Sequence, residues 1–520
     1  MAIGITTGAG PTPGGELADG APAPAAKRST VRTVPVPLRV AAVPFVVTLV
    51  VTLVGIGDRQ LWRDEHATWW AASLSWADLR HLVGTVDLVL FPYYVLMHVW
   101  IDVFGDSPAA LRVPSALFMA VAAGLLALLG RRLFDTPSGL VAGLLLAVVP
   151  AISRYGQEAR PYAMTLAATV AAALLLLRAL EKPTPWRWAG YGLAVLWVAC
   201  SHAVALMALA AHLVAVASAA AGASTTAETG ARRRRILFGW AIALGAALVT
   251  AAPLVLVGMR QGGQIGWVPD PIWARVESFP ASMFMSGAVA GFIVVLGVVA
   301  LVLTRAAPGP DRRPGLLLAA WAVLPPVLAY YTFDAFGLFY PRYLLFTVPA
   351  WVLAAAWGLR RLAGRALVPV ALAALVAVGG ASLPAQRFVR SDAAQNEFAF
   401  AAAARYLGDR ESPGDGVVYT GYPKTHRAFR YELEQAGRPV PPEILSEPPP
   451  GQPWSWQRID RADPAAALAG YRRVWLVSTD PGKDALSGVS PAVRAVLADR
   501  YTVADTRTFH RMRVSLLIAE

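Results

Sequence analysis

The sequence is dominated by repeated apolar runs that are long enough to cross a lipid bilayer. A hydrocarbon core about 30 Å thick needs roughly 20 residues of apolar helix, because backbone polar groups must be bonded within the segment. Hydrophobic residues make up 56% of the 520 residues. A water-soluble domain does not carry so many runs of this kind, so the pattern predicts a polytopic α-helical, multi-pass membrane protein.

About eleven transmembrane helices are predicted, and the arginines predict their orientation. Short arginine clusters separate alternate apolar runs, as expected if basic residues stay on the cytoplasmic side. The net charge of +13 is therefore attributed to membrane topology, and no nucleic-acid partner is expected. A cytoplasmic N-terminus and this number of crossings put the C-terminus outside. The predicted ranges are 36–57, 109–130, 138–153, 162–180, 187–203, 205–222, 236–258, 281–304, 314–332, 343–359 and 366–384.

Composition divides the chain into three parts. Residues 1–33 are rich in Gly, Pro, Ala and Thr, which predicts a disordered cytoplasmic tail. Residues 34–384 carry the apolar runs and form the predicted transmembrane domain. Residues 385–520 have a mixed composition that predicts a small, extracytoplasmic soluble α/β domain. Its predicted strands lie at 416–419, 474–477 and 514–518, and its predicted helices near 396–406, 426–435 and 491–498.

Two features of the composition indicate the source, the cellular location and the role of the cysteine. Arginine far outnumbers lysine, and with the abundant Ala, Gly and Pro this suggests a bacterial genome of high GC content. The expected location is therefore the bacterial plasma membrane. The single cysteine, Cys200, lies in an apolar run, so an intramolecular disulfide is excluded and packing is its expected role.

The first outer loop is the longest of the less apolar segments. Two of its stretches, Ala67–Leu82 and Phe91–Phe104, are amphipathic and rich in Trp and Tyr. Such stretches are typical of helices that lie along the membrane surface, where they would frame a site at the interface. The predicted outer segments are 58–108, 154–161, 259–280 and 333–342.

Asp64 and Glu65 are adjacent carboxylates that follow the first apolar run. Where a helix leaves the bilayer, such groups can face both water and a lipid-borne substrate. The pair is therefore a candidate for chemistry on a membrane-anchored donor. The plain alternative is that both residues only cap the following surface helix.

Five short motifs occur in a fixed order on the predicted outer face. They are Asp64-Glu65, the stretch from Asp87 to His98, Leu111-Arg112-Val113-Pro114-Ser115, Gln157-Glu158-Ala159-Arg160-Pro161-Tyr162, and Tyr340-Pro341-Arg342-Tyr343-Leu344-Leu345. Together they resemble the GT-C glycosyltransferases. The resemblance is greatest to the actinobacterial mannosyltransferase-like branch, which is related to protein O-mannosyltransferases and to the aminoarabinose transferase of lipid A. It covers roughly residues 36–384, which would then be the catalytic domain.

The resemblance implies an inverting glycosyltransferase. A sugar, expected to be mannose, would pass from a polyprenyl-phosphate donor to an acceptor hydroxyl on a glycan, glycolipid or protein at the outer face. Asp64 would be the general base, because a carboxylate can orient the hydroxyl and take its proton. Glu65 belongs to the same catalytic group, and Asp87 would hold the acceptor or position the loop. A solvated turn residue is the alternative for Asp87.

The donor phosphate needs cationic partners, and the motifs contain two. Arg160 and Arg342 come from different outer segments, and a guanidinium can bind a phosphate through two donors. Tyr162 and Tyr343 follow them closely and are expected to assist. The alternative is that both arginines extend to lipid headgroups and that the tyrosines belong to the interfacial aromatic belt.

The acceptor side of the pocket is assigned to Tyr93, Tyr94 and His98. Many relatives have a Pro-Pro pair ahead of the Tyr-Tyr, whereas this chain has Leu90-Phe91-Pro92, so we expect that part of the pocket to differ. The histidines of the outer face, His66, His98 and His202, match no zinc spacing. A divalent cation is left open, and no metal ligand is assigned.

Two other classes of protein share parts of this pattern. A transporter or flippase of lipid-linked sugars would also have many spans, but polar residues should then recur at mid-membrane depth. The centres of the apolar runs here are mostly Ala, Val and Leu. A non-catalytic membrane scaffold would account for the C-terminal domain but not for the five motifs. Transfer from a labelled polyprenyl-phosphate sugar separates the three classes.

The arginine pattern generates a topology prediction. If the clusters mark the cytoplasm, residues 385–520 lie outside, so a cysteine placed in the Pro441–Pro453 loop should react with an impermeant maleimide in intact cells. The measurement is labelling before and after lysis. Labelling only after lysis would mean that the number of spans is off by one.

Overall fold

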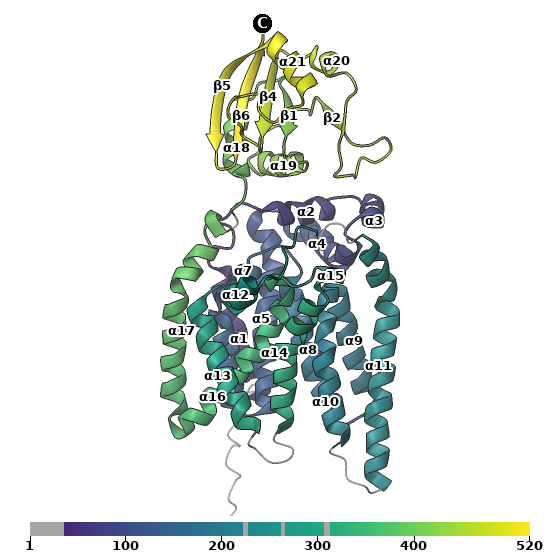
Figure 1. Cartoon of the computed structure of the whole chain (residues 1–520), viewed down its shortest axis with the longest axis vertical. Helices are drawn as coiled ribbons and strands as arrows, with labels where there is room; N and C mark the ends of the chain where they lie inside the picture. The colour runs from purple at the N-terminus through teal and green to yellow at the C-terminus, as the bar shows by residue number, and fades with distance from the viewer. Residues whose placement is uncertain (1–35, 222–226, 262–265, 306–311, 395) are drawn as a thin grey trace, which may run out of the picture.

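The computed structural model describes residues 36–221, 227–261, 266–305, 312–394 and 396–520, so the predicted tail at 1–33 lies outside the described residues. Long helices form a bundle, and a smaller part that contains a sheet covers one of its ends (Figure 1). Among the described residues, seven helices are long and apolar enough to cross a membrane, or up to eight if a bent pair counts as one span.

The predicted count of about eleven spans is therefore not confirmed. A helix of the bundle lies in each predicted range, but some, such as α9 with 17 residues and α16 with 16, are shorter than a full span. The bundle helices are α1 (Val36–Leu53), α5 (Pro108–Leu133), α6 (Thr136–Val148), α8 (Tyr162–Glu181), α9 (Pro185–Ser201), α10 (Leu209–Ala221), α11 (Ala227–Arg260), α13 (Gly287–Arg305), α14 (Arg312–Tyr331), α16 (Val348–Ala363) and α17 (Leu367–Val389).

The predicted range 138–153 is a broken helix. α6 ends before Val149, α7 (Pro150–Gly156) follows, and the two are bent by 66°. Pro150 has no backbone N–H to continue the hydrogen-bond ladder of α6, and it restricts the residue before it to extended conformations. The bend brings the segment after α7 to the end of the bundle that the sheet covers (Figure 1).

The segment predicted as the first outer loop forms helices that lie across this end of the bundle (Figure 1). The predicted stretch 67–82 is two helices, α2 and α3, because the Ser75 side chain accepts a hydrogen bond from the Asp78 N–H and starts a new helix. The loop contains α2 (Arg63–Ala72), α3 (Trp76–Thr85), η1 (Leu88–Leu90) and α4 (Phe91–Phe104). The other short helices are η2 (Ala203–Ala208), α12 (Trp273–Phe284), α15 (Phe333–Phe336), η5 (Pro341–Thr347), η6 (Gly364–Ala366) and η7 (Asp392–Ala394).

The C-terminal part is built on a four-stranded sheet of order β1-β4-β6-β5. β1 and β4 are parallel, while β6 is antiparallel to both β4 and β5. Strands lie at the three predicted places, but β5 was not predicted from the sequence. The elements are β1 (Gly416–Thr420), β4 (Arg473–Ser478), β5 (Tyr501–Phe509), β6 (Met512–Ala519), the small pair β2 (Ser446–Glu447) and β3 (Ile459–Asp460), and the helices α18 (Phe400–Gly408), α19 (Thr425–Gln435), α20 (Pro464–Leu468) and α21 (Pro491–Arg500).

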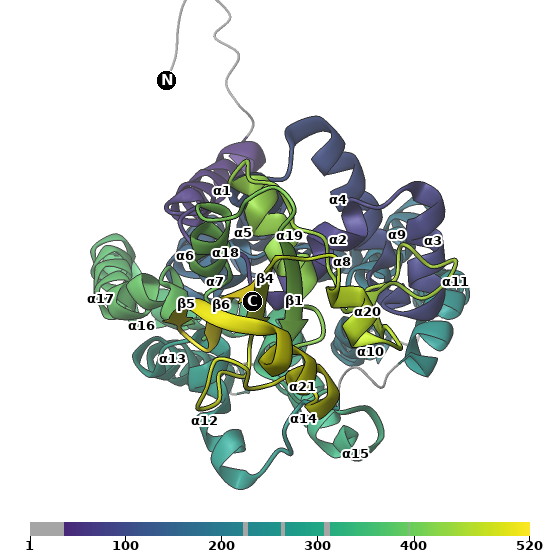
Figure 2. The same ribbon diagram turned by 90° about the horizontal axis from the view of Figure 1, so that it is seen from above.

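The two faces of this sheet are covered by different helices. α18 and α19 pack on the face nearer the bundle, and α20 and α21 pack on the other (Figure 1). Viewed from above, the sheet lies over the middle of the bundle (Figure 2). α19 is therefore the element that faces the surface helices, and it contacts α2 directly.

Hydrogen bonds fasten the C-terminal part to the first outer loop. The side-chain amide of Gln60 donates to the Phe398 carbonyl at 2.7 Å and accepts from the Ala401 N–H at 3.0 Å. Arg63 pairs with Glu397 at 2.8 Å. These contacts, which span more than 300 residues of sequence, fix α2 against the C-terminal part.

Candidate functional site

Three segments that are far apart in sequence meet where α2 begins. They are the start of α2, the connection between α7 and α8, and η5. All lie at the end of the bundle beneath the C-terminal part (Figure 1). Their polar side chains form the candidate site.

A buried ion pair between Glu65 and Arg112 holds these segments together. The guanidinium donates from Nε and Nη2 to the two carboxylate oxygens, each at 2.8 Å. Both side chains have no exposed surface. The carboxylate also accepts from the Ala159 N–H at 3.0 Å and from the Trp62 N–H at 3.3 Å. Glu65 thus ties α2, α5 and the segment after α7 to one point.

The remaining donors of Arg112 bind the chain that leads into α2. Nη1 donates to the carbonyls of Ile56 and Arg59, and Nη2 donates to that of Gln60, at 2.9–3.0 Å. Burial would raise the pKa of the Glu65 carboxyl, but the charge and hydrogen bonds of Arg112 lower it to about 2. Glu65 is therefore ionised at neutral pH, and all its bonds are made within the protein.

Asp64, unlike Glu65, is not sealed inside the protein. Its carboxylate is about a third exposed, at 32%, and Oδ2 lies 3.6 Å from Nη1 of Arg342, whose side chain is 12% exposed. At this distance the pair is loose compared with the bidentate pair of Glu65. The adjacent acids therefore have different surroundings, one sealed in the protein and one open.

Arg342 lies in an aromatic enclosure. The guanidinium carbon is 4.8 to 6.0 Å from five ring centroids, a range in which cation–π attraction acts. Two of the rings are predicted site residues, and one, Trp62, immediately precedes α2. The rings belong to Trp62, Tyr162, Trp267, Tyr340 and Tyr343.

Arg160 lies within electrostatic range of the same carboxylate. Burial would lower the pKa of its guanidinium, but the negative charges of Asp64 and Asp87 hold that pKa well above its usual value. Nε of Arg160 and Nε of Arg342 are both buried and have no hydrogen-bond partner among the described residues. Buried N–H groups of a cation are costly to leave unbonded, so the site has spare donors for an anion.

Glu158 is a further buried acid that the sequence did not single out. Its carboxylate lies 2.6 Å from Nη1 of Arg154 and is completely buried. Burial raises the pKa of Glu158, Arg154 opposes this, and the nearby charge of Glu65 adds to it. Glu158 belongs to the Gln157–Tyr162 motif and Arg154 precedes it. This motif was the sequence signal that could have identified both residues.

Asp87 has a backbone conformation that ordinary residues seldom adopt, with φ of 58°. Its carboxylate accepts a hydrogen bond from the Tyr94 hydroxyl at 3.0 Å. Strained backbone of this kind is often found at functional sites. The structure therefore brings two predicted residues, Asp87 and Tyr94, into direct contact.

The C-terminal part contributes a residue that no sequence motif singled out. Arg427 of α19 is 4% exposed, and its Nε has no hydrogen-bond partner among the described residues. Burial lowers the pKa of this guanidinium, and Tyr422 first, then Tyr94, Asp87 and Asp64, oppose that effect. Arg427 thus lies within electrostatic range of Asp64 and Asp87, although it is more than 300 residues away from them in sequence.

The other predicted pocket residues lie further from Asp64 or are closed off. Tyr93 is completely buried. His98 donates from Nδ1 to the Ala72 carbonyl at 2.8 Å, and its ring lies 4.0 Å from that of Trp76. These contacts join α4 to the end of α2, so the structure does not bring His98 to the carboxylate.

The three histidines of the predicted outer face have different surroundings. His66 faces Glu432 at 3.4 Å, and His202 lies between the rings of Tyr162 and Tyr343, with centroid distances of 5.9 and 5.3 Å. Among the described residues, no group of three or more His, Cys, Asp or Glu side chains is arranged to hold a metal ion.

The geometry fits one kind of chemistry. An exposed carboxylate can accept a proton from a hydroxyl, while guanidinium groups beside it can bind an anion that forms or departs. The surroundings of Asp64 suit the first function, and the buried donors of Arg160 and Arg342 suit the second. The aromatic rings around Arg342 restrict its side chain, which favours a pre-organised site.

A family profile described as "Dolichyl-phosphate-mannose-protein mannosyltransferase" matches residues 91–256. This range includes Tyr93, Tyr94 and Arg160 but neither Asp64 nor Arg342. A comparison with curated proteins gave no significant match.

Solved structures match over most of the chain. ArnT from Cupriavidus metallidurans, bound to undecaprenyl phosphate, matches with a TM-score of 0.58 and 14% identity, covering 92% of this chain and 98% of that one. AglB from Archaeoglobus fulgidus, in complex with an inhibitory peptide and a dolichol-phosphate, matches with a TM-score of 0.48 and 12% identity, covering 85% and 69%. The family profile and the ArnT-like fold confirm the resemblance to GT-C glycosyltransferases.

The Glu65–Arg112 pair generates a stability prediction. Glu65→Gln leaves the Arg112 charge buried without its counter-ion, so it should destabilise the protein by about 3–5 kcal/mol. The measurement is thermal unfolding of the purified protein in detergent. Glu181→Gln is the matched control, because its pair with Arg132 is largely exposed and should matter by about 1 kcal/mol or less.

The same pair predicts a pH dependence. The pKa of Glu65 is lowered on folding from the usual 4.5 to about 2, so its stabilisation is complete above pH 4.5 and is lost as the pH falls through about 2. The stability difference between the parent and Glu65→Gln should therefore be constant from neutral pH to about pH 5 and shrink below it. A difference that shrinks between pH 6 and 8 would contradict this assignment.

Proposed function

We propose that this protein is an inverting membrane glycosyltransferase that moves a sugar, mannose by preference, from a polyprenyl-phosphate donor to an acceptor hydroxyl at the outer face of the membrane. The observation that carries the proposal is the site around Asp64. A partly exposed carboxylate lies there near arginines whose buried Nε–H groups lack partners among the described residues. A phosphate would supply those partners.

The position of the site favours a donor that arrives through the membrane. The site lies at the end of an apolar bundle, where the phosphate of a lipid could reach it while the prenyl chain stays in the bilayer (Figure 1). The similar ArnT structure contains undecaprenyl phosphate, and the matching family profile is described by dolichyl-phosphate mannose. Both support a polyprenyl-phosphate donor for this chain.

In the proposed reaction Asp64 takes the proton of the acceptor hydroxyl as its oxygen attacks the anomeric carbon. The new carbon–oxygen bond forms as the bond from the anomeric carbon to the phosphate oxygen breaks, and the electron pair stays on the phosphate. Arg160 and Arg342 bind the developing charge, the kind of interaction that lowers the barrier most. Attack opposite to the leaving phosphate inverts the anomeric configuration.

The other residues have supporting roles in this proposal. Glu65 was predicted as part of the catalytic group, but its carboxylate is sealed and fully bonded to Arg112 and backbone N–H groups, so we assign it a positioning role. Asp87 holds the acceptor together with Tyr94. Tyr162 and Tyr343 restrict the Arg342 guanidinium.

The proposed orientation follows from the arginines at the opposite end of the bundle. Arg131 and Arg132 lie in the last turn of α5, and Arg360 and Arg361 lie in the last turn of α16. Basic residues favour the cytoplasmic side. The C-terminal domain, residues 385–520, would then be extracytoplasmic, together with the site.

The first activity prediction concerns the base. Asp64→Asn keeps the shape of the side chain but cannot take the proton, so single-turnover transfer in nanodiscs should fall by about 10²-fold or more. Thermal stability and donor binding should change little, since the Asp64–Arg342 pair is loose and partly exposed. Activity within about threefold of the parent would be incompatible with Asp64 as the base.

The second activity prediction concerns the phosphate. Arg160→Ala or Arg342→Ala should weaken the use of polyprenyl-phosphate mannose by about 1.5–3 kcal/mol, and Lys should restore only part, because it lacks the bidentate fork. Arg275→Ala is the matched control, since Arg275 is an exposed arginine of α12 near the same end. Equal effects at all three positions, or efficient use of GDP-mannose, would refute the assignment.

A further inference from the structure

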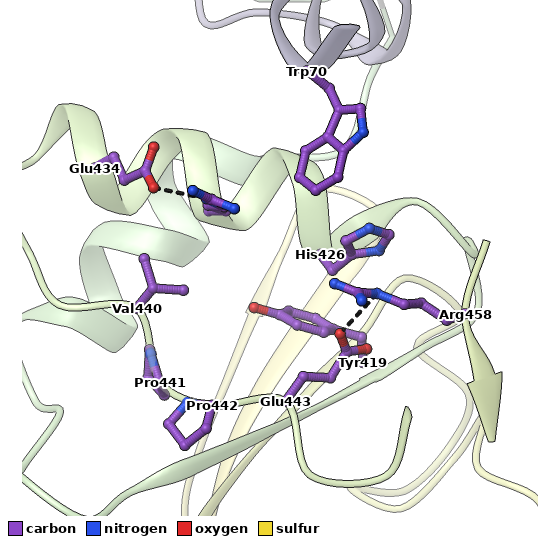
Figure 3. Close-up of a pocket in the computed structure, with 10 residues that line it drawn as sticks. Trp70, Tyr419, His426, Glu434, Val440, Pro441, Pro442, Glu443 and Arg458 are labelled. Atoms are coloured by element: carbon purple, nitrogen blue, oxygen red, sulfur yellow. Dashed lines mark hydrogen bonds and ion pairs between the residues drawn. The ribbon is translucent and has the colours of Figure 1, made fainter. Parts of the chain in front are cut away.

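A polar pocket lies between α2 and the C-terminal part, outside the site described above. Figure 3 shows Trp70 approaching from one side and residues of the C-terminal part around the rest. The pocket has a volume of ≈ 340 Å³. Small-molecule sites begin at about 300 Å³, so the pocket suits a ligand of one or two rings. It is lined by Trp70, Tyr419, His426, Arg430, Glu434, Val440, Pro441, Pro442, Glu443 and Arg458.

The charges of the pocket are balanced. Arg430 pairs with Glu434 at 2.8 Å, and Arg458 pairs with Glu443 at 3.2 Å (Figure 3). Each cation therefore faces one carboxylate, and Nε of Arg458 is a buried donor without a hydrogen-bond partner among the described residues. A phosphate would have to displace a carboxylate, whereas a neutral group can share both partners. The pocket offers donors and acceptors side by side without excess charge.

His426 supplies an unused polar group at this pocket. The side chain is 6% exposed, and its Nε2 has no hydrogen-bond partner among the described residues. Burial and the charges of Arg458 and Arg427 lower the pKa of the imidazole to about 2, so the ring is neutral. A buried polar atom without a partner is costly, and a hydroxyl of a ligand would relieve that cost.

Aromatic rings complete the lining. Trp70 lies edge-on to His426, with ring centroids 5.8 Å apart, and Tyr419 projects from β1. Rings give an apolar surface on which the C–H face of a sugar can pack, while the flanking polar groups bind its hydroxyls. The combination of rings, paired charges and a neutral imidazole matches the chemistry of a neutral sugar.

The pocket is close to the proposed active site. Trp70 follows Asp64 by six residues on α2, a rise of about 9 Å along the helix. His426 is next to Arg427, which lies near Asp87. A glycan of a few sugar units is long enough to span this rise.

We propose that this pocket binds a neutral sugar unit of the acceptor glycan and so holds the chain whose end is extended at Asp64. Binding in the pocket stands on its own lining, whereas the role in transfer rests on the proposed function. The two are tested separately. The acceptor class that follows is a glycan or glycolipid with at least one neutral sugar beyond the reacting unit.

Binding is tested with the full-length Asp64→Asn protein in nanodiscs, which takes turnover out of the measurement. The probes are neutral trisaccharides of mannose, glucose and galactose, and trigalacturonate and inorganic phosphate are the charged comparators. Saturation-transfer NMR and calorimetry should detect at least one neutral trisaccharide, and neither charged comparator should displace it. Absence of binding by all three neutral trisaccharides, or displacement by phosphate, would overturn the proposal.

Two pocket variants locate the binding. Glu443→Gln breaks a charge pair, and His426→Phe keeps the ring but removes its polar atoms, so each should weaken binding by about tenfold. Glu447→Gln is the matched control, because its ion pair with Arg461 lies nearby but outside the pocket. Unchanged affinity in both pocket variants, with their melting temperatures preserved, would place the sugar elsewhere and refute the proposal.

The link to transfer has its own readout. In the active protein the same two variants should raise KM for a glycan acceptor by about tenfold and leave kcat and the KM of the lipid donor unchanged. A fall in kcat alone would assign the residues to the chemical step and refute the acceptor role. Sugar binding without transfer would leave the pocket assigned and remove only its link to the proposed function.

Discussion

The buried pair of Glu65 and Arg112 is the interaction on which the site depends. It joins the start of α2, the helix α5 and the Ala159 backbone, and its remaining donors bind carbonyls of the chain entering α2. A buried charge is tolerated only with such complete bonding. Because this point is fixed, the neighbouring Asp64 is held at the surface of the site with little freedom of the backbone.

The arginines of this region have contrasting surroundings. Arg112 has all its charge and donors satisfied within the protein, whereas Arg160 and Arg342 keep buried donors without partners among the described residues. Burying these unbonded donors is unfavourable. The aromatic rings around Arg342 and the buried Glu65–Arg112 pair offset that cost. Buried donors without partners are expected where a ligand, rather than the fold, accepts their hydrogen bonds.

The C-terminal part is fastened to α2 and changes what the site contains. Gln60 and Arg63 bind its first residues, and α19 brings Arg427 close to the acids of the first outer loop. The same helix brings His426 to the pocket beside Trp70. The sequence alone predicted only a separate soluble domain. In the structure this domain contributes side chains next to the helical bundle, because long-range contacts decide where α19 lies.

Apolar periodicity was enough to locate the helices of the bundle and three strands, since burial imposes these patterns directly on the sequence. It missed β5, whose residues are mostly exposed, and it merged α2 and α3, which a single cap at Ser75 separates. The short motifs located Asp64, Arg160 and Arg342. Their adjacency in space, and the opposite environments of Asp64 and Glu65, were decided only by the tertiary structure. Neighbouring residues on a helix point about 100° apart, so which acid is sealed and which is open depends on where Arg112 and Arg342 fall.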